Sequence, residues 1–250
     1  MRILLTNDDG IHAPGLALLE RIARALSDDV TVCAPAEEQS GAGHSLTLHM
    51  PVRLHSFGEK RYAVTGTPGD AVNLALRKLF PEGPPDLVLS GINNGENLAD
   101  DVTYSGTISA AMESALAGIP SIALSQALRD RGHGFSAAEG WAEQVLRPLI
   151  DLAMPKRTLI NVNFPALPAA DVRGIRVARQ GFHDYARGSV VESVDPRGRP
   201  YFWFGLDDIE HTLDHGTDLE AVSDGYVSVT PLQLDLTHHA SIGLLADRFG

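Results

Sequence analysis

The sequence contains one cysteine and no long apolar run. Because Cys33 is the only cysteine among the 250 residues, no disulfide can form within the chain. Cys33 lies in the apolar run Val30–Ala34, where a thiol is usually a small core residue. No run approaches the roughly 18 apolar residues of a membrane span, and the polar Asn7 leaves no room for a secretory signal. We therefore expect a soluble, cytoplasmic protein that does not contact a membrane.

Positive charge is also scarce. Twenty lysines and arginines stand against 32 aspartates and glutamates, so the formal net charge is −12. Such a surplus repels a phosphodiester backbone, and we expect no nucleic-acid polymer as a partner. If the substrate is a small anion, a metal ion or a helix N-terminus must reverse the field at the site.

Several well-known enzyme signatures are missing. The chain has no Gly-x-x-x-x-Gly-Lys-[Ser/Thr], no Gly-x-Gly-x-x-Gly after the first predicted strand and no Gly-x-Ser-x-Gly. These absences argue against a P-loop NTPase, a typical dinucleotide enzyme and a serine hydrolase. His211 and His215 are four residues apart but lack the glutamate of a zinc-protease helix, so we interpret them as surface or hydrogen-bonded histidines.

The first part of the chain alternates short apolar runs with helical periods. The runs predict strands at Ile3–Thr6, Val30–Ala34, Asp86–Ser90, Pro120–Ser125 and Leu159–Asn163, and a hairpin of Ser45–His55 with Arg61–Thr65. Helices are predicted from Pro14, from Thr67, over Thr107–Ala117 and over Ala137–Met154. Thr67 and Asp70 have the spacing of a capping box, and Pro148 should kink or break the last helix. This alternation predicts an α/β fold, a doubly wound, mainly parallel Rossmann-like sheet.

The pattern becomes rich in β-branched and turn residues from about residue 174. A turn at Asp195–Pro200 separates Val190-Val191 from Tyr201–Phe204, which predicts an extended hairpin. We expect residues 1–173 to form a Rossmann-like catalytic core. Residues 174–250 would add a C-terminal hairpin arm and closing elements rather than an independent domain. The hairpin is either an oligomerisation arm or folded back on its own core.

Polar loops follow the predicted strands, and in an open α/β sheet ligands bind at the carboxyl ends of the strands. Asp8 and Asp9 follow the first strand; adjacent carboxylates repel each other unless a cation lies between them. Glu38–Ser45 brings glycines and hydroxyls, and Ser90–Asn97 brings glycines and side-chain amides. Taken alone, each loop also fits an ordinary turn, helix cap or hairpin entry.

A fourth polar segment, Ser105–Thr107, opens a predicted helix. It fits either an ordinary N-cap or an anion site at the helix N-terminus. If the four segments meet at one end of the sheet, they supply oxygen ligands for a metal and a helix terminus for a phosphate. His12, just beyond the acidic pair, is either an acid/base or outer-sphere residue or a loop histidine without such a role.

Longer motifs give the chain a family resemblance. They are Thr6–Gly15, Gln39–Gly41, Gly66–Pro68, Ser90–Asn93, Asp101–Thr107 and Gly225–Leu232. In this order, from residue 1 to about 235, they resemble the survival protein E (SurE) family of nucleotidases. The resemblance implies a metal-dependent phosphatase of nucleoside 5'- and 3'-monophosphates, sometimes also of short polyphosphate. It also implies a homodimer or homotetramer that exchanges C-terminal elements.

The resemblance also implies site residues. The metal, one Mg²⁺ or Mn²⁺, maps onto Asp8, Asp9, Ser40 and Asn93, with Asp8 and Asp9 as the catalytic pair; the phosphate site maps onto Asn97, Ser105, Gly106 and Thr107. The ion would polarise the phosphoryl group and activate water. We favour attack by water over attack by Asp8, because aspartyl-phosphate enzymes usually present Asp-x-Asp. In one departure, Ala99 stands where the family usually has the glycine of Asn-x-Gly.

Two alternatives remain from the sequence. Base recognition has no signature here, so the substrate of a phosphatase with this site could be another small phosphorylated metabolite. An acidic pair after the first strand is also how Mg²⁺-binding receiver domains of signalling proteins begin. A receiver needs an aspartate after its third parallel strand and a lysine after its fifth, where this chain has Ser90–Asn93 and Asn163–Pro165.

Overall fold

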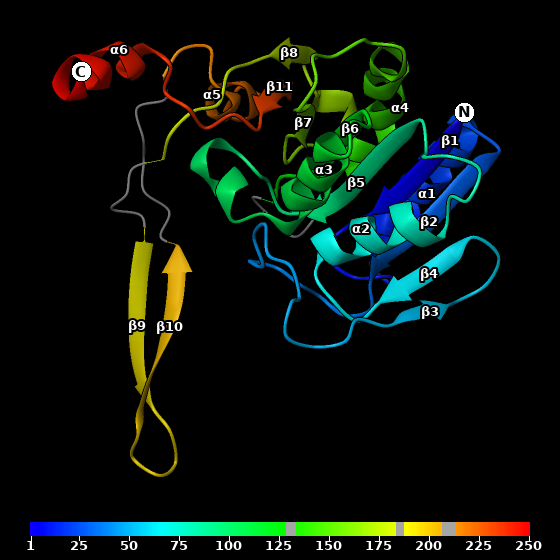
Figure 1. Cartoon of the computed structure of the whole chain (residues 1–250), viewed down its shortest axis with the longest axis horizontal. Helices are drawn as coiled ribbons and strands as arrows, with labels where there is room; N and C mark the ends of the chain where they lie inside the picture. The colour runs from blue at the N-terminus through cyan, green and yellow to red at the C-terminus, as the bar shows by residue number, and fades with distance from the viewer. Residues whose placement is uncertain (129–133, 184–187, 207–213) are drawn as a thin grey trace.

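A computed structural model of the chain describes residues 1–128, 134–183, 188–206 and 214–250. Within these residues a nine-stranded sheet has the order β3-β4-β2-β1-β5-β6-β7-β11-β8 (Figure 1). Its central strands are all parallel: β1 (Arg2–Thr6), β2 (Asp29–Pro35), β4 (Arg61–Val64), β5 (Leu87–Asn94), β6 (Ser121–Gln126) and β7 (Thr158–Phe164). Counted along the chain they lie in the order 3-2-1-4-5-6, which is the Rossmann order. The predicted fold class is therefore confirmed.

Shorter and antiparallel strands complete the two edges. At one edge, β3 (Leu54–Ser56) is antiparallel to β4; at the other, β11 (Val227–Gln233) is antiparallel to β7 and parallel to β8 (Ile175–Val177). The predicted strand over 45–55 is wrong for most of its length. Its backbone is bonded elsewhere, because the N–H of Thr47 donates to Asp70 Oδ1 (3.1 Å) at the start of the next helix.

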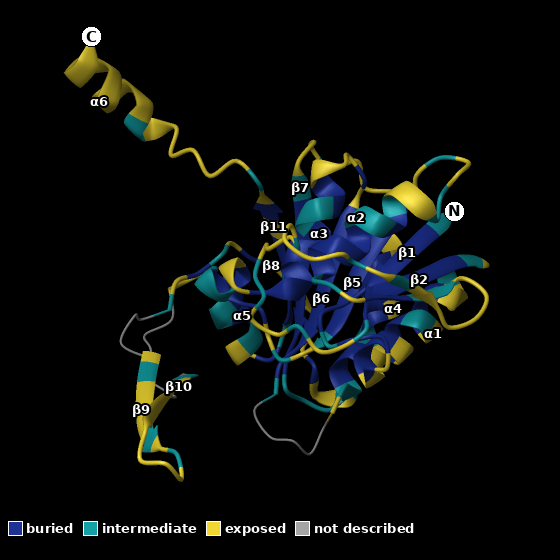
Figure 2. Ribbon diagram, turned by 60° about the horizontal axis from the view of Figure 1, so that its bottom comes forward, coloured by how far each residue is buried: buried dark blue, intermediate teal, exposed yellow. Residues whose placement is uncertain are grey.

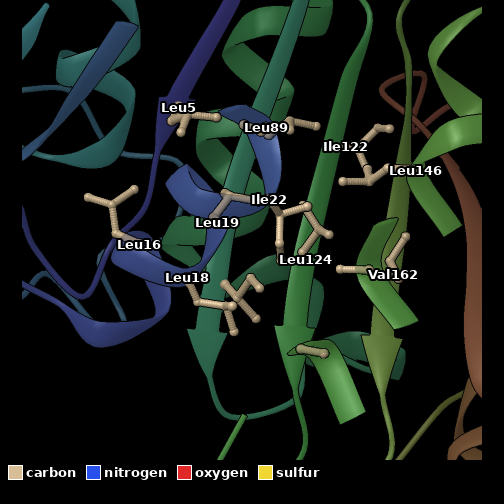
Figure 3. Close-up of a cluster of buried hydrophobic side chains, with 14 of the residues drawn as sticks. Leu5, Leu16, Leu18, Leu19, Ile22, Leu89, Ile122, Leu124, Leu146 and Val162 are labelled. Carbon is tan, nitrogen blue, oxygen red and sulfur yellow. The ribbon is translucent and has the colours of Figure 1, made fainter. Parts of the chain in front are cut away.

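Helices cover both faces of the sheet. One face packs against α1 (Pro14–Leu26) and α4 (Ser136–Ile150), and the other against α2 (Pro68–Lys78) and α3 (Gly106–Leu116) (Figure 1). Within β1, Leu5 faces the α1 side and Leu4 faces the α2 side, as the twofold period of a strand requires. Figure 3 shows the first of these cores, with Leu19 of α1 and Leu124 of β6 among its members. Helix α4 continues through Pro148 and ends at Ile150, before the predicted end.

Two helix starts lie at the carboxyl end of the sheet and are fixed by side-chain caps. Thr67 and Asp70 form the predicted capping box of α2, each side chain accepting the other's backbone N–H. Ser105 caps α3 by accepting the N–H of Ile108 (3.1 Å). A short 3-10 helix, η1 (Ala99–Thr103), leads into this cap, and a second one, η2 (Ala169–Asp171), follows β7.

The C-terminal region reaches away from this core. Strands β9 (Gly188–Val194) and β10 (Pro200–Leu206) form the predicted hairpin, which projects from the body of the molecule (Figure 1). Trp203 is 65% exposed and Phe204 88% exposed, so the fold-back alternative is wrong. After α5 (Asp218–Ser223) and β11, helix α6 (Ala240–Phe249) has no buried residue (Figure 2). Among the described residues, no helix is both long and apolar enough to cross a membrane.

Candidate metal and phosphate site

The loops after β1, β2 and β5 meet at the carboxyl end of the sheet. Strands β1 and β5 are neighbours at the point where the strand order reverses, which is where open α/β sheets bind ligands. The backbone N–H of Asn94 donates to Asp9 Oδ2 (3.2 Å), and that of Gln39 donates to the carbonyl of Asp8 (2.8 Å). The N–H of Gly43 donates to the carbonyl of Tyr104 (3.1 Å). These bonds bring all four predicted polar segments together.

Asp8 is a buried carboxylate at the end of β1. Its Oδ1 accepts a hydrogen bond from the hydroxyl of Thr107 in the first turn of α3. Burial raises the pKa of Asp8 to about 6; the Thr107 bond acts against this shift, and the charge of Asp9 adds to it. Burial also raises the pKa of Asp9, which the Asn94 N–H opposes and the charge of Glu38 increases. Within the described residues, no lysine or arginine forms an ion pair with either carboxylate.

The N-terminus of α3 packs directly against Asp8. A Cβ added at Gly106 would lie 2.7 Å from Asp8 Cβ and 2.9 Å from Asp8 Oδ2, distances that real Cβ atoms do not reach. Only glycine therefore allows this approach. The N–H groups of Gly106 and Thr107 have no partner inside the helix, because the first turn of any α-helix leaves its donors free. The partially positive N-terminus of α3, with its free N–H groups, thus lies beside the acidic pair.

Ser40 and Asn93 lie on the loops around this pair. The exposed hydroxyl of Ser40 donates to Glu38 Oε1 (2.9 Å), and Asn93 Nδ2 donates to the carbonyl of Gly95 (2.9 Å). The register between β5 and β6 shifts between Ser90 and Asn93, a local irregularity of the kind that re-aims side chains next to functional sites. Among the described contacts, neither side chain bonds to Asp8 or Asp9.

Asn97 occupies a different environment. Its Nδ2 donates to Ser125 Oγ (2.8 Å), and its backbone N–H donates to Asn163 Oδ1 (2.8 Å). Its carbonyl accepts from the side chains of Asn161 (2.8 Å) and Asn163 (3.1 Å). The structure therefore places Asn97 in a buried polar network on β6 and β7, whereas Ser105, Gly106 and Thr107 lie at the helix terminus.

The groups at the end of β1 fit a hard divalent cation. Asn7 Oδ1 is buried and has no hydrogen-bond partner within the described residues. The side chains of these loops, two carboxylates with amide and hydroxyl groups, offer oxygen donors only, which suits Mg²⁺ or Mn²⁺. The described residues contain no group of three or more histidine, cysteine, aspartate or glutamate side chains arranged for a metal. A site here would therefore combine the acidic pair with neutral oxygens.

Other residues at the site were not predicted from their loops. The N–H of Asn94 and the charge of Glu38 act on Asp9, yet nothing in a single sequence separates them from their neighbours. His12 is exposed, and its ring lies against Phe57 (5.5 Å between ring centroids), which favours a packing role. His215 pairs with Glu220 (3.0 Å), as expected for a surface histidine, and His211 lies outside the described residues.

Comparisons with known proteins agree on one family. A model of the family described as "Survival protein SurE" matches residues 3–187. The chain is 67% identical to a protein of Erythrobacter litoralis and 58% identical to one of Rhizorhabdus wittichii, both named "5'-nucleotidase SurE". These alignments cover 100% of both chains in the first case and 97% of both in the second. The crystal structure of the SurE protein from Aquifex aeolicus superposes with a TM-score of 0.88 at 40% identity, covering 100% of each chain. This chain therefore belongs to the SurE family.

Proposed function

We propose that the chain is a metal-dependent nucleotidase. It hydrolyses nucleoside 5'-monophosphates, and also 3'-monophosphates and short polyphosphate, to release phosphate. The observation that carries the proposal is the contact between Asp8 and the first turn of α3. It puts the proposed metal ligand Asp8 directly beside the proposed phosphate ligands. Its full-length relatives named 5'-nucleotidase support the substrate class.

The proposed ligands of one Mg²⁺ or Mn²⁺ are Asp8, Asp9, Ser40 and Asn93. Burial, and to a smaller extent the neighbouring acidic charges, raises the pKa of both aspartates. This supports the assignment, because two adjacent carboxylates that are shielded from water need a cation to stay ionised together. The ion's chemistry is to polarise the phosphoryl group and to activate water. The proposed phosphate ligands are Ser105, Gly106 and Thr107. Asn97 is the weakest of the proposed phosphate ligands, because its amide already donates to Ser125.

The chain's own residues then have distinct tasks. Thr107 holds the carboxylate of Asp8 in one orientation, and the Asn94 N–H holds that of Asp9. The helix end binds the phosphoryl oxygens and neutralises charge that develops during transfer. We assign the attack to water rather than to Asp8, whose Oδ1 is already bonded to Thr107. Trapping a phosphorylated enzyme would overturn that assignment.

The proposal includes a homodimer or homotetramer formed through the C-terminal arm. The exposed Trp203 and Phe204, and the exposed Leu244 of α6, support it, because a chain by itself leaves this apolar surface in water. Residues 174–250 would not form an independent domain, since β8 and β11 complete the main sheet. The single buried Cys33 supports a reducing, cytoplasmic location.

Phosphate release is the direct test. Chelator-treated protein is assayed with nucleoside monophosphates, sugar phosphates and tripolyphosphate, with and without added Mn²⁺ or Mg²⁺. We expect release from nucleotides that requires the metal and is lost in Asp8→Asn and Asp9→Asn. Asp28 is an exposed aspartate before β2, so Asp28→Asn is the matched control, and we expect it to keep full activity. Metal-dependent release from sugar phosphates alone would identify a different phosphatase. No phosphate release from any substrate would reject the proposed enzymatic activity.

A further inference from the structure

Asp218, at the start of α5, is a fully buried carboxylate outside the site described above. Its Oδ2 accepts the backbone N–H of Ala99 (3.0 Å), and its Oδ1 accepts the backbone N–H groups of Gly181 (2.8 Å) and Leu219 (2.9 Å). Aspartate is rarely buried so completely, and three backbone donors satisfy the charged form. The carboxylate thus joins three segments that are far apart in the sequence.

The same short stretch, residues 98–101, receives further bonds from the C-terminal region. Gln180 Nε2 donates to the carbonyl of Ala99 (2.9 Å), and the backbone N–H of His183 donates to Asp100 Oδ1 (2.7 Å). Ala99 itself has a left-handed backbone with φ +51°, which a residue with a side chain adopts only where the surroundings hold it. We call residues 98–101 the anchored segment.

The anchored segment leads directly into the phosphate site. The Asp101 carbonyl accepts the N–H of Tyr104 (2.9 Å), and Ser105, the cap of α3, follows immediately. A shift of the anchored segment must therefore move the start of α3. In the sequence, Gln180 precedes the hairpin and Asp218 follows it, so both chain ends of the projecting arm are tied to this segment.

We propose that Asp218 is a positioning residue for phosphate binding, with Gln180 as a second anchor. The carboxylate holds the anchored segment in its left-handed turn, and this sets the position of the N–H groups of Gly106 and Thr107. The inference rests on the proposed function for its substrate. It adds a dependence of that site on the C-terminal region, which contributes none of the proposed ligands.

The test compares Asp218→Asn and Gln180→Ala with Asp224→Asn. Asp224 is the matched control because it ends the same helix and bonds Arg176 (2.9 Å) at the surface, away from the anchored segment. For each protein we would measure the affinity for inorganic phosphate by calorimetry, the affinity for Mn²⁺, amide hydrogen exchange over residues 97–104, and KM and kcat for a nucleoside monophosphate.

In Asp218→Asn, one oxygen acceptor becomes a donor facing a backbone N–H, so we expect phosphate Kd and KM to rise about tenfold. We expect about a threefold rise in Gln180→Ala, which loses one neutral hydrogen bond. Exchange over residues 97–104 should accelerate in both, Mn²⁺ affinity should stay within about twofold, and Asp224→Asn should match the unmodified protein.

Unchanged phosphate affinity and unchanged exchange, with only a lower Tm, would overturn the positioning role and leave Asp218 a stabilising residue. If Asp218→Asn fails to fold, Gln180→Ala decides by the same measurements. Absence of nucleotide hydrolysis in the unmodified protein would reject the proposed function. Phosphate affinity and hydrogen exchange would still decide the role of Asp218.

Discussion

The end of β1 and the C-terminal arm break the usual rules of residue placement in opposite directions. At the end of β1, Asp8 and the Oδ1 of Asn7 are polar and buried. In the arm, Trp203 and Phe204 are apolar and exposed. Each arrangement costs free energy in a single chain without ligands. We propose that a different partner relieves each arrangement, a cation with a phosphate in one case and a second copy of the chain in the other.

This contrast indicates which parts of the molecule carry its function. The two helix-covered faces of the sheet obey the ordinary rules, with Leu4 and Leu5 pointing into separate apolar cores. Sequences that are consistent at most positions break their own local rules mainly at functional sites. The four predictions below test whether both exceptions are functional, starting with the largest expected effect.

Asp8→Asn should remove a large pH dependence of stability from the metal-free protein. Because the folded pKa of Asp8 is about 6 and its ordinary value is 3.8, the folded state keeps a proton that the unfolded chain releases. Its contribution of about 3 kcal/mol is fully present below the unfolded pKa of 3.8 and is lost as the pH rises through the folded pKa of about 6. Urea unfolding between pH 4 and 7 would measure this. If the free energies of unfolding of the variant and the unmodified protein change with pH in parallel, burial of Asp8 does not destabilise its charged form.

Gly106→Ala should damage the site although it removes none of the proposed ligand groups, since the backbone N–H of residue 106 remains. The new Cβ would overlap Asp8, so the start of α3 must move, and displacements of about 1 Å can cost about a hundredfold in rate. We expect a loss of that size in kcat/KM. Gly243→Ala in α6, where a Cβ meets nothing within 4 Å, is the matched control. Equal activities of the two variants would mean that the close packing at Gly106 is irrelevant.

Replacing two aromatic side chains should weaken assembly while sparing the site. In the double variant Trp203→Ser with Phe204→Ser, we expect self-association to weaken about a hundredfold, since buried aromatic residues dominate interface energies. Sedimentation velocity across a concentration series gives the dissociation constant. Leu152→Ser, an exposed apolar residue outside the arm, should leave it unchanged. If the unmodified protein is monomeric at all concentrations, the exposed aromatic residues of the arm do not mediate self-association.

Ala99→Gly should leave stability nearly unchanged, because opposing effects cancel. Glycine relieves the left-handed strain of about 1–2 kcal/mol. Its greater freedom in the unfolded chain takes back about 0.4–1 kcal/mol, and the loss of the fully buried Ala99 methyl group costs about 0.8 kcal/mol. We expect Tm to stay within about 1 °C by calorimetry, whereas Ala17→Gly, at an exposed position within α1, should lower Tm by about 2–4 °C. Equal losses of Tm in the two variants would mean that the backbone at Ala99 is not strained.

Much of the fold follows from local patterns in the sequence. The periodic runs of β1 and α1 and the capping box at Thr67 are local signals, and each lies where it was predicted. The segment 45–53 is an exception, because its alternation of apolar and polar residues is strand-like, whereas the backbone of Thr47 bonds to Asp70. The insertion of β11 between β7 and β8 was not predictable, because pairing between distant strands leaves no local trace.

The candidate site, too, is predictable from the sequence only where local patterns mark it. Motifs located the loops that hold Asp8, Asn93 and Ser105, because polar residues at strand ends are unusual in a buried sheet. The bond between Asp218 and Ala99 joins residues 119 positions apart, and Thr217-Asp218 reads locally as a common helix start. Alanine itself gives no sign of the left-handed backbone at residue 99; the sign is the glycine that the family usually has at this position. Contacts of this kind become visible only when the chain is folded.

The place of β11 has a consequence for how the chain is made. Strand β8 pairs with β11, so residues 175–177 have no sheet partner until residues 227–233 leave the ribosome. Strands β1 to β7 can assemble earlier, and the edge of β7 stays open meanwhile. An open edge is a template for pairing with other chains. During synthesis this protein therefore exposes the edge of β7 until its own late strand, β11, pairs there.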